Sequence, residues 1–219
     1  RVVLECQPEL KRLLLRSPGV DVIAERTVSG QPLAAYERHL PMLSLPRVFN
    51  TRMDTVPSVF PYIRPEPWLA ERWAARLAQN KKLRIGIVWA GRPTHEDDQN
   101  RSCHPAHFAR LARFANVTLY SLQKGGAAQD VETLLESGIV DLEPEIDDFA
   151  DTAAVIENLD LVICVDTSVA HLAGAMGKPV WVVLPFAPDF RWLACGEMSP
   201  WYPSARLFRQ AETNDWDSV

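Results

Sequence analysis

Residues 162–184 constrain the fold of this chain more than any other segment. An apolar, largely β-branched run at 162–165 ends in an Asp-Thr-Ser turn at 166–168, and a helix rich in small residues starts at once. A second apolar run follows at 180–184. A strand, a tight turn, a helix and a strand in this order are typical of a parallel sheet. The turn therefore lies at the carboxyl end of a strand, where open α/β sheets bind their ligands.

The chemistry of the 166–168 turn favours an anion. The first residues of a helix carry N–H groups without a partner inside the helix and lie at the positive end of its dipole, so they attract phosphates. Thr167 and Ser168 add hydroxyl groups at the same place, and Ala170, Ala173 and Gly174 allow the helix to lie close to the sheet. We therefore expect a binding site for a nucleotide diphosphate at this turn.

Composition excludes several other classes of protein. Of the 219 residues, 47% are apolar and 23% are charged, as in an ordinary soluble globular protein. The formal net charge of −5 argues against nucleic-acid binding, and no apolar run approaches the roughly 20 residues that a membrane span needs. The four cysteines form no Cys-x-x-Cys pair, which indicates free thiols in a reducing compartment rather than zinc or disulfides. We expect a cytoplasmic protein.

A proline-rich segment divides the chain into two predicted domains. Residues 57–67 contain four prolines, which favour extended chain over helix, so this segment is the expected linker. Residues 1–56 precede it as a partial N-terminal Rossmann-like unit, and residues 68–219 follow it as a larger Rossmann-like domain. In the first unit we expect strands at 2–6 and 20–24, a helix at 8–16, and a short strand and loop at 39–45.

Strands and helices alternate regularly in the second domain. Apolar residues spaced along one helical face start it at 68–79. The expected strands are 84–90, 117–122, 139–142, 160–165 and 180–184; the expected helices between them are 105–114, 127–137 and 151–159, the last capped by Asp148 or Asp151. This alternation predicts an α/β fold with a doubly wound, mainly parallel sheet.

Three loops at the carboxyl ends of these strands are expected to meet at one edge of the sheet. They are residues 90–102, residues 121–126 and the 166–168 turn. A guanidinium on the first loop, an ammonium on the second and helix N–H groups on the third would surround an anion. The candidate ligand-binding residues are Gly91, Arg101, Ser102, Gln123, Lys124, Asp166, Thr167, Ser168, Val169 and His171.

Each of these residues also has an ordinary structural role to weigh. Lys124, beside two glycines, can be a solvated turn residue, and Arg101 can pair with an aspartate at 97–98. The hydroxyls of the 166–168 turn can simply cap the helix, and His171 can be a core histidine. Their shared edge of the sheet is what favours a ligand site.

Several enzyme classes lack their motifs. The loop around Lys124 does not have the order of a Walker A loop, and no Gly-x-Gly-x-x-Gly follows a strand. A hydrolase triad is excluded because the Gly-x-Ser-x-Gly elbow is missing, and no metal-binding pattern joins the five histidines. The aromatic and proline-rich residues 184–203 indicate a rigid packed loop more than a surface that stacks on a base.

An ordered set of motifs carries a family resemblance. The chain resembles the glycosyltransferase-type domain that follows tetratricopeptide repeats in many bacterial proteins, which is similar to the heptosyltransferases and distantly to O-linked GlcNAc transferase. The matching segments are Gly86-Ile87-Val88-Trp89-Ala90-Gly91, His95, Asn100-Arg101-Ser102, Ser121-Leu122-Gln123-Lys124-Gly125, Asp148-Phe149-Ala150-Asp151-Thr152-Ala153, Asp166 through Gly174, and Leu184-Pro185-Phe186 through Trp201-Tyr202-Pro203.

This resemblance implies a GT-B fold and an inverting glycosyltransferase that needs no metal or other cofactor. A nucleotide sugar would be the donor, and a sugar, a lipid-linked sugar or a protein the acceptor, with tetratricopeptide repeats upstream. By analogy Lys124 and the backbone of residues 167–169 would bind the donor diphosphate, Asp166 and His171 would shape that site, and Arg101 with Ser102 would approach a phosphate or the sugar.

The chain also departs from the family pattern. The glycine-rich first loop of the N-terminal domain, which carries the acidic base of the relatives, is absent, so His95 and Asp54 stand as the candidates for a catalytic base. Because the chain starts at Arg1 and stops soon after a predicted helix start at 213–216, we expect it to be part of a longer protein. Two alternatives stay open: a non-catalytic GT-B-like interaction module beside the repeats, and a sugar-nucleotide epimerase on the same fold.

Overall fold

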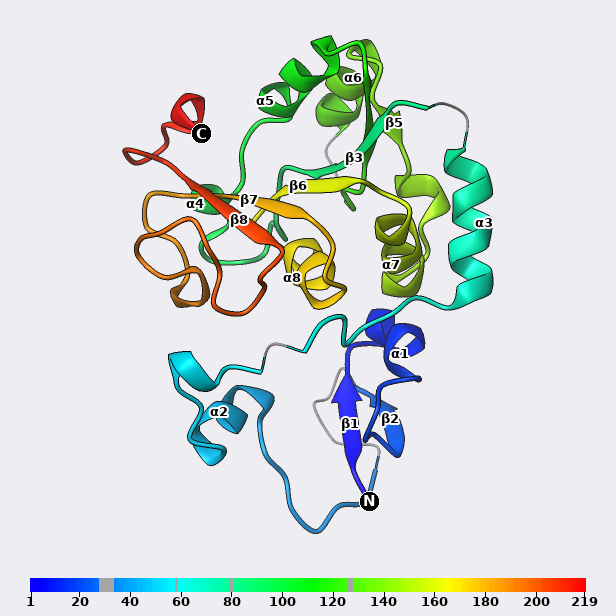
Figure 1. Ribbon diagram of the computed structural model, residues 1–219, viewed down its shortest axis with the longest axis vertical. Coiled ribbons are helices and arrows are strands. Elements are labelled where there is room, and N and C mark those ends of the chain that lie inside the picture. The colour runs from blue at the N-terminus through cyan, green and yellow to red at the C-terminus, as the bar shows by residue number, and fades with distance from the viewer. Residues whose placement is uncertain (28–33, 58, 79–80, 126–127) are drawn as a thin grey trace.

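A six-stranded parallel sheet forms the centre of the molecule. The computed structural model describes residues 1–27, 34–57, 59–78, 81–125 and 128–219. In these residues the sheet has the strand order β5-β4-β3-β6-β7-β8 (Figure 1). Its strands are β3 (Leu83–Val88), β4 (Val117–Ser121), β5 (Val140–Asp141), β6 (Leu161–Val165), β7 (Val180–Leu184) and β8 (Ala205–Arg209), and every neighbouring pair is parallel.

Helices cover both faces of this sheet. On one face lie α5 (Ala106–Ala109), continued by a 3-10 turn at Arg110–Arg113, and α6 (Ala128–Glu136); on the other lie α7 (Phe149–Glu157) and α8 (Ser168–Ala175), with α3 (Pro67–Leu77) beside α7 (Figure 1). The one-turn helix α4 (Asp98–Arg101) lies in the loop that follows β3. The arrangement is the doubly wound α/β sheet that the alternation of strands and helices predicts.

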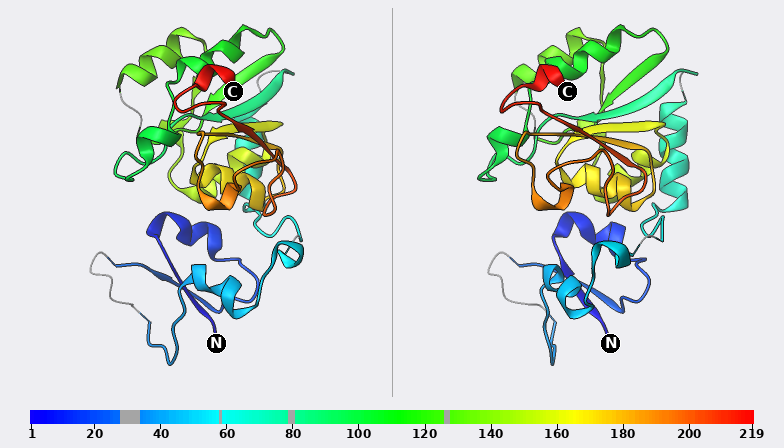
Figure 2. Two further views of the ribbon diagram at one scale, coloured as in Figure 1. Left: turned by 90° about the vertical axis from the view of Figure 1, so that its left-hand side faces the viewer. Right: turned by 60° about the vertical axis from the view of Figure 1, so that its left-hand side comes forward.

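A smaller unit lies against the helix layer formed by α7 and α8 (Figures 1 and 2). It contains a two-stranded parallel sheet of β1 (Val3–Cys6) and β2 (Val22–Glu25), joined by α1 (Pro8–Leu14). A 3-10 turn (Met42–Ser44), the short helix α2 (Leu45–Val48) and a second 3-10 turn (Met53–Thr55) follow. The connecting segment is hydrogen-bonded to the larger part, because the N–H groups of Tyr62 and Ile63 donate to the carbonyl oxygen of Ala175.

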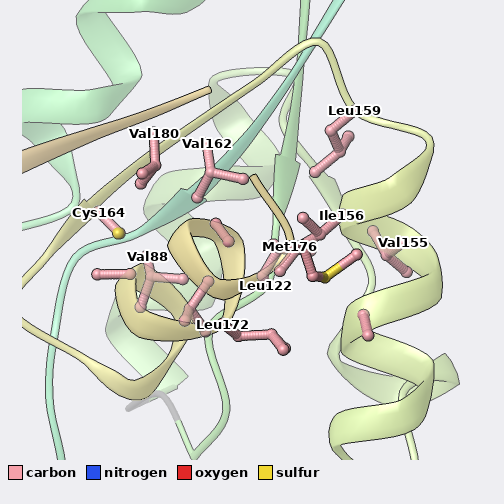
Figure 3. Packing of buried hydrophobic residues seen from close by; sticks show 14 of the residues in the cluster. Val88, Leu122, Val155, Ile156, Leu159, Val162, Cys164, Leu172, Met176 and Val180 are labelled. Atoms are coloured by element: carbon pink, nitrogen blue, oxygen red, sulfur yellow. The ribbon is translucent and has the colours of Figure 1, made fainter. Parts of the chain in front are cut away.

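The larger hydrophobic cluster lies between the sheet and the layer of α3, α7 and α8, and a smaller one lies on the other face with α5 and α6. Figure 3 shows side chains of β3 and β6 meeting those of α7 and α8, among them Val88, Val162, Ile156 and Leu172. Every residue of α7 from Ala150 through Ile156 is buried, so neighbouring elements surround this part of the helix. Leu13 of α1 belongs to the same cluster, which means that the smaller unit contributes to the main core.

Arg12 joins the smaller unit to the start of α7. Its guanidinium forms ion pairs with Asp148, at 2.9 Å, and with Asp151. Asp148 is also the N-cap of α7, where its carboxylate accepts from the N–H groups of Ala150 and Asp151. Trp73 of α3 donates its indole N–H to the other oxygen of Asp151, at 3.1 Å. The prediction that Asp148 or Asp151 caps this helix is confirmed for Asp148.

Several expected elements differ from the structure. The short strand predicted at 39–45 is wrong, because a 3-10 turn and the start of α2 occupy these residues, and Pro46 suits a first helical turn. The helix expected at 105–114 changes to 3-10 geometry at Arg110. Pro67, expected in the linker, begins α3. Residues 126–127, expected in a loop and at a helix start, and residue 79, the expected end of a helix, lie outside the described residues.

The last strand has no counterpart in the sequence prediction. Strand β8 adds a sixth strand beside β7, in register from Val180↔Ala205 to Leu184↔Arg209. After it, the expected helix start at 213–216 is a 3-10 turn at Trp216–Ser218, capped by the Asp215 carboxylate. None of the described helices is long and apolar enough to span a bilayer. The four cysteines are free thiols.

Candidate functional site

The carboxyl ends of β4, β3 and β6 lie side by side, which brings the three predicted loops together. The N–H of Ala90, just after β3, donates to the Gln123 side-chain oxygen at 3.0 Å. The N–H of Gly91 donates to the Ser102 hydroxyl at 2.9 Å. Gln123 is buried and also donates to the carbonyl oxygen of Lys124. The expectation that residues 90–102 and the loop after β4 meet at one edge is confirmed.

Arg101 connects the first loop to the 166–168 turn. Its guanidinium donates to the main-chain carbonyl of Asp166 at 3.3 Å and pairs with the Asp98 carboxylate at 3.2 Å. The pairing with a neighbouring aspartate, weighed as an alternative from the sequence, therefore occurs together with the contact to the turn. The side chains of Arg101 and Asp98 are 15% and 14% exposed, so the ion pair is largely buried rather than free in solvent.

Gly91 is a glycine because of this pair. A Cβ atom at Gly91 would collide with the Arg101 guanidinium and the Asp98 carboxylate. The backbone after β3 therefore passes directly over the ion pair. Gly91 positions Arg101 through this close approach, in addition to the hydrogen bond that its N–H gives to Ser102.

The 166–168 turn begins helix α8 without a side-chain cap. Thr167 occupies the N-cap position in extended conformation, but its hydroxyl accepts no hydrogen bond from the helix. Apart from the nearby Cys164 sulfur, a weak acceptor to which the hydroxyl donates, no polar group in the described part of the chain partners this buried hydroxyl. Ser168 is exposed at the first helical position, and Val169 is buried. No side chain caps the first N–H groups of α8, which leaves them available to a ligand.

Asp166 and His171 face each other across this turn. Asp166 is 7% exposed, and its Oδ1 lies 3.8 Å from Nε2 of His171, one helical turn later. Nδ1 of His171 lies 3.0 Å from the Tyr202 hydroxyl, and the imidazole stacks on the Trp192 ring. Burial lowers the pKa of His171 below its usual value, against the opposing effect of the Asp166 carboxylate. Burial therefore favours the neutral imidazole.

Lys124 follows β4, as expected, but its ammonium group is occupied. It donates to the carbonyl oxygens of Glu143 and Ile146 at 3.0 and 2.8 Å, and it lies 3.5 Å from the Glu143 carboxylate. These contacts hold the loop after β4 against the segment that follows β5. The role of Lys124 as a diphosphate ligand stays a prediction, which requires the ammonium to exchange these carbonyls for phosphate oxygens.

The two candidate bases are both on the surface. His95 is exposed, and its Nδ1 accepts from the N–H of Asp97. Asp54 is exposed in the 3-10 turn of the smaller unit. Within the described residues no contact joins either side chain to the 166–168 turn, and no group of three His, Cys, Asp or Glu side chains is arranged to hold a metal ion.

Two residues of the site were not singled out from the sequence. Tyr202 and Trp192 lie in the aromatic loop, which we define as residues 185–204, and both contact His171. Trp192 is fully buried, whereas Phe186 and Phe190 are 56% and 70% exposed. The expectation of a packed loop is thus met by part of the aromatic set only. The many aromatic residues in the sequence of this loop indicated packing, but they could not identify His171 as the residue that the rings contact.

The proteins that this chain resembles in sequence agree with this geometry. Residues 106–184 match the family model described as glycosyltransferase family 9 (heptosyltransferase). The matched stretch runs from α5 to the end of β7 and includes the loop after β4 and the 166–168 turn. Protein FlbA of Caulobacter vibrioides is 26% identical over 226 residues, which cover 91% of this chain and 36% of FlbA.

Solved glycosyltransferases share the fold. E. coli ADP-heptose LPS heptosyltransferase II superposes with a TM-score of 0.52 at 18% identity, over 73% of this chain and 50% of that one. A glycosyl transferase family 9 protein of Veillonella parvula superposes with a TM-score of 0.55 at 14% identity, over 99% and 59%. The predicted α/β fold of the GT-B type is confirmed. The chain spans about a third of FlbA and half to three fifths of these two structures.

Proposed function

We propose that this chain is the donor-binding part of an inverting glycosyltransferase that takes its sugar from a nucleotide diphosphate without a metal ion. The observation that carries the proposal is the meeting of the uncapped start of α8, the Arg101 guanidinium and the His171 imidazole at one turn. Helix N–H groups and a fixed cation are the groups that bind a diphosphate in other α/β folds. The match of residues 106–184 to glycosyltransferase family 9 supports the same assignment.

The proposed chemistry uses the turn to stabilise the leaving group. When an acceptor hydroxyl attacks the anomeric carbon from the face opposite the diphosphate, negative charge grows on the diphosphate oxygens. The N–H groups of residues 168–169 and the guanidinium of Arg101 are already in place to offset that charge, so little reorganisation is needed. A base removes the acceptor proton, and His95 and Asp54 remain the candidates within this chain.

The wider setting belongs to the same proposal. The acceptor would be a sugar, a lipid-linked sugar or a protein, and the protein would be bacterial, cytoplasmic and joined to upstream tetratricopeptide repeats. The residues that contribute to donor binding would be those named from the sequence. Gly91, Ser102 and Gln123 would act by holding the loops, and Lys124 by leaving the carbonyls of Glu143 and Ile146.

A non-catalytic module is the second candidate. The occupied ammonium of Lys124 and the exposed position of Asp54 in a 3-10 turn of the smaller unit favour it. Such a module would keep the fold and the packed site but would transfer no sugar. Binding of a nucleotide does not separate the two candidates, whereas formation of a glycosylated product does.

Calorimetric titration tests the donor site directly. We would titrate the chain with UDP, ADP, GDP and the matching nucleotide sugars in EDTA, beside Arg101→Gln and Lys124→Ala. Arg113→Gln, an exposed arginine on the far face of the sheet, is the matched control. We expect one nucleotide class to bind and Arg101→Gln to weaken it roughly tenfold or more, as for a charge-assisted hydrogen bond. A folded chain that binds none of these nucleotides contradicts the proposal.

A further inference from the structure

The proposed chemistry gives the aromatic loop no role, yet two of its rings contact His171. The Tyr202 hydroxyl lies 3.0 Å from Nδ1, and the Trp192 ring stacks on the imidazole with centroids 5.0 Å apart and an angle of 19°. Trp192 is fully buried, so this contact is part of the core rather than a surface encounter. The imidazole is thus fixed from one face and from one edge.

We propose that Tyr202 is a positioning residue, which holds His171 as a neutral imidazole with its proton on Nε2, facing Asp166 and the 166–168 turn. The inference rests on the proposed function in one respect only, which is the group that accepts from the Nε2–H: a phosphate oxygen of the donor. The positioning itself is a property of the chain without any ligand.

The two ring nitrogens meet chemically different neighbours. Nε2 lies 3.8 Å from the Asp166 carboxylate, which attracts a proton on that nitrogen and repels a lone pair. A neutral imidazole with its proton on Nε2 carries a lone pair on Nδ1, and this lone pair accepts the O–H of Tyr202. Burial, together with a hydrogen bond to the Tyr62 side chain, raises the pKa of Tyr202 well above its usual value, so the hydroxyl keeps its proton. Two acceptors are in reach of that proton, the Tyr62 oxygen and Nδ1 of His171.

Tyr202 itself has little freedom. A Cβ atom on Gly174 of α8 would collide with the Tyr202 ring, so the ring lies directly against the helix backbone. The Ser199 hydroxyl accepts from the N–H groups of Trp201 and Tyr202 and fixes the backbone before the ring. The hydroxyl is therefore delivered to Nδ1 by packing on one side and by a turn on the other.

Charged groups around His171 do not reverse this assignment. Burial is the largest effect on its pKa and lowers it. Asp166 of the turn raises the pKa, Arg191 of the aromatic loop lowers it, and Asp189 of the same loop raises it. Arg191 and Asp189 are paired with each other at 3.2 Å, which reduces the influence of both.

Nitrogen NMR of the imidazole tests the proposal. Long-range proton–nitrogen correlations distinguish the two neutral forms, and a His171→Gln variant assigns the signals among the five histidines. We expect the Nε2–H form alone in the native chain. In Tyr202→Phe, which keeps the ring, we expect the two nitrogen signals to move toward each other as both forms become populated. Tyr36→Phe, in the smaller unit, should leave them unchanged.

Two results would overturn the inference. One is a native chain with the proton on Nδ1; the other is a Tyr202→Phe spectrum identical to the native one. A second measurement connects the positioning to the donor: Tyr202→Phe should weaken nucleotide binding by a factor of about three to ten, the effect of one hydrogen bond. If the native chain binds no nucleotide, the proposed function fails, while the nitrogen spectra still decide the role of Tyr202.

Discussion

Two glycines of the site are present because a side chain passes directly over each of them. Gly91 lies under the pair of Arg101 and Asp98, and Gly174 lies under the ring of Tyr202. Neither has the positive φ that would otherwise explain a glycine. The two cases differ in what must move. At Gly91 the obstacles are the ends of flexible side chains, whereas at Gly174 they are the Cβ, Cγ and Cδ1 atoms at the base of the packed Tyr202 side chain.

A Gly174→Ala substitution should therefore destabilise the protein. We expect a loss of about 1–3 kcal/mol in the free energy of unfolding, the usual cost of an added methyl group in a packed core. Urea unfolding of Gly174→Ala, Tyr202→Ala and the double variant measures the coupling between the two sites. The cost of the alanine should be smaller when the Tyr202 ring is already absent. Equal costs in both backgrounds would mean that another neighbour of Gly174 is responsible.

His171 should make stability depend on pH. Burial lowers its pKa in the folded state, so the unfolded chain, with a histidine pKa near about 6.5, takes up a proton first as the pH falls. The stability that comes from burying the neutral ring is present above that pH and is lost below it. Urea unfolding at about pH 7.5 and about pH 5.5 should show a larger loss for the native chain than for His171→Gln. An equal loss in both would contradict a buried neutral imidazole.

At the scale of single elements, the start of α7 combines a helix cap with an ion pair to the smaller unit. Asp148 caps the helix, and Asp151 is almost completely buried between the guanidinium of Arg12 and the indole of Trp73. A carboxylate in such a place needs its partners, because an unpaired buried charge is costly. The cap and the contact between the two units are therefore made by the same few atoms.

Removing Arg12 should weaken both at once. Arg12→Met keeps an unbranched apolar stem but removes the guanidinium, and it leaves the Asp151 carboxylate with Trp73 as its remaining described partner. We expect the free energy of unfolding to fall by about 1–3 kcal/mol. This loss is below the full cost of breaking a buried pair, because the Arg12 side chain is 33% exposed. Arg16→Met, at an exposed position just after α1, should change the unfolding free energy by less than about 0.5 kcal/mol. Equal effects would rule out the ion pair as the cause.

Elements with a strong local pattern could be predicted, and those set by distant contacts could not. Strand β7 has the predicted bounds because five apolar residues lie between turn signals. Strand β8 was missed because Arg206 and Arg209 interrupt its apolar residues, and its place in the sheet comes from pairing with β7. The strand expected at 39–45 failed because a run of apolar residues broken by prolines also suits short helical turns.

The same distinction applies to the site. The meeting of the three loops followed from strand ends in a parallel sheet, and the contact of Arg101 with the Asp166 carbonyl bears it out. The contact of Tyr202 with His171 joins residues 31 positions apart through an irregular loop. No local pattern encodes that contact, because it depends on how the aromatic loop folds back over α8. The occupied ammonium of Lys124 was hidden for the same reason.

At the scale of the whole molecule, the smaller unit shares its core with the larger one. Leu13 of α1 is buried in the cluster that contains Trp73 and α7, and Leu10 packs against that cluster. The linker predicted at 57–67 therefore joins two parts that are continuous in their packing, even though each part has its own sheet. A destabilising substitution in α1 should therefore lower the stability of the larger part as well.

Leu13→Ala tests this continuity. We expect the midpoint of urea unfolding to fall, with a loss of about 2–5 kcal/mol, and the far-ultraviolet circular dichroism and tryptophan fluorescence to shift together. Leu15→Ala, at a position that is 58% exposed, is the matched control and should have little effect. Separate transitions for the two signals would mean that the two parts unfold independently.

The burial of α7 from Ala150 through Ile156 has a consequence for hydrogen–deuterium exchange. Seven consecutive residues, 150–156, have no exposed side, and the helix contacts α1, α3 and α8 as well as the sheet core. Its amide protons can reach solvent only when these neighbours separate, so they should exchange at the rate of global unfolding. A peptide covering residues 149–157 would thus report the stability of the whole protein, while the exposed helical turns at Met42–Val48 would exchange by local opening.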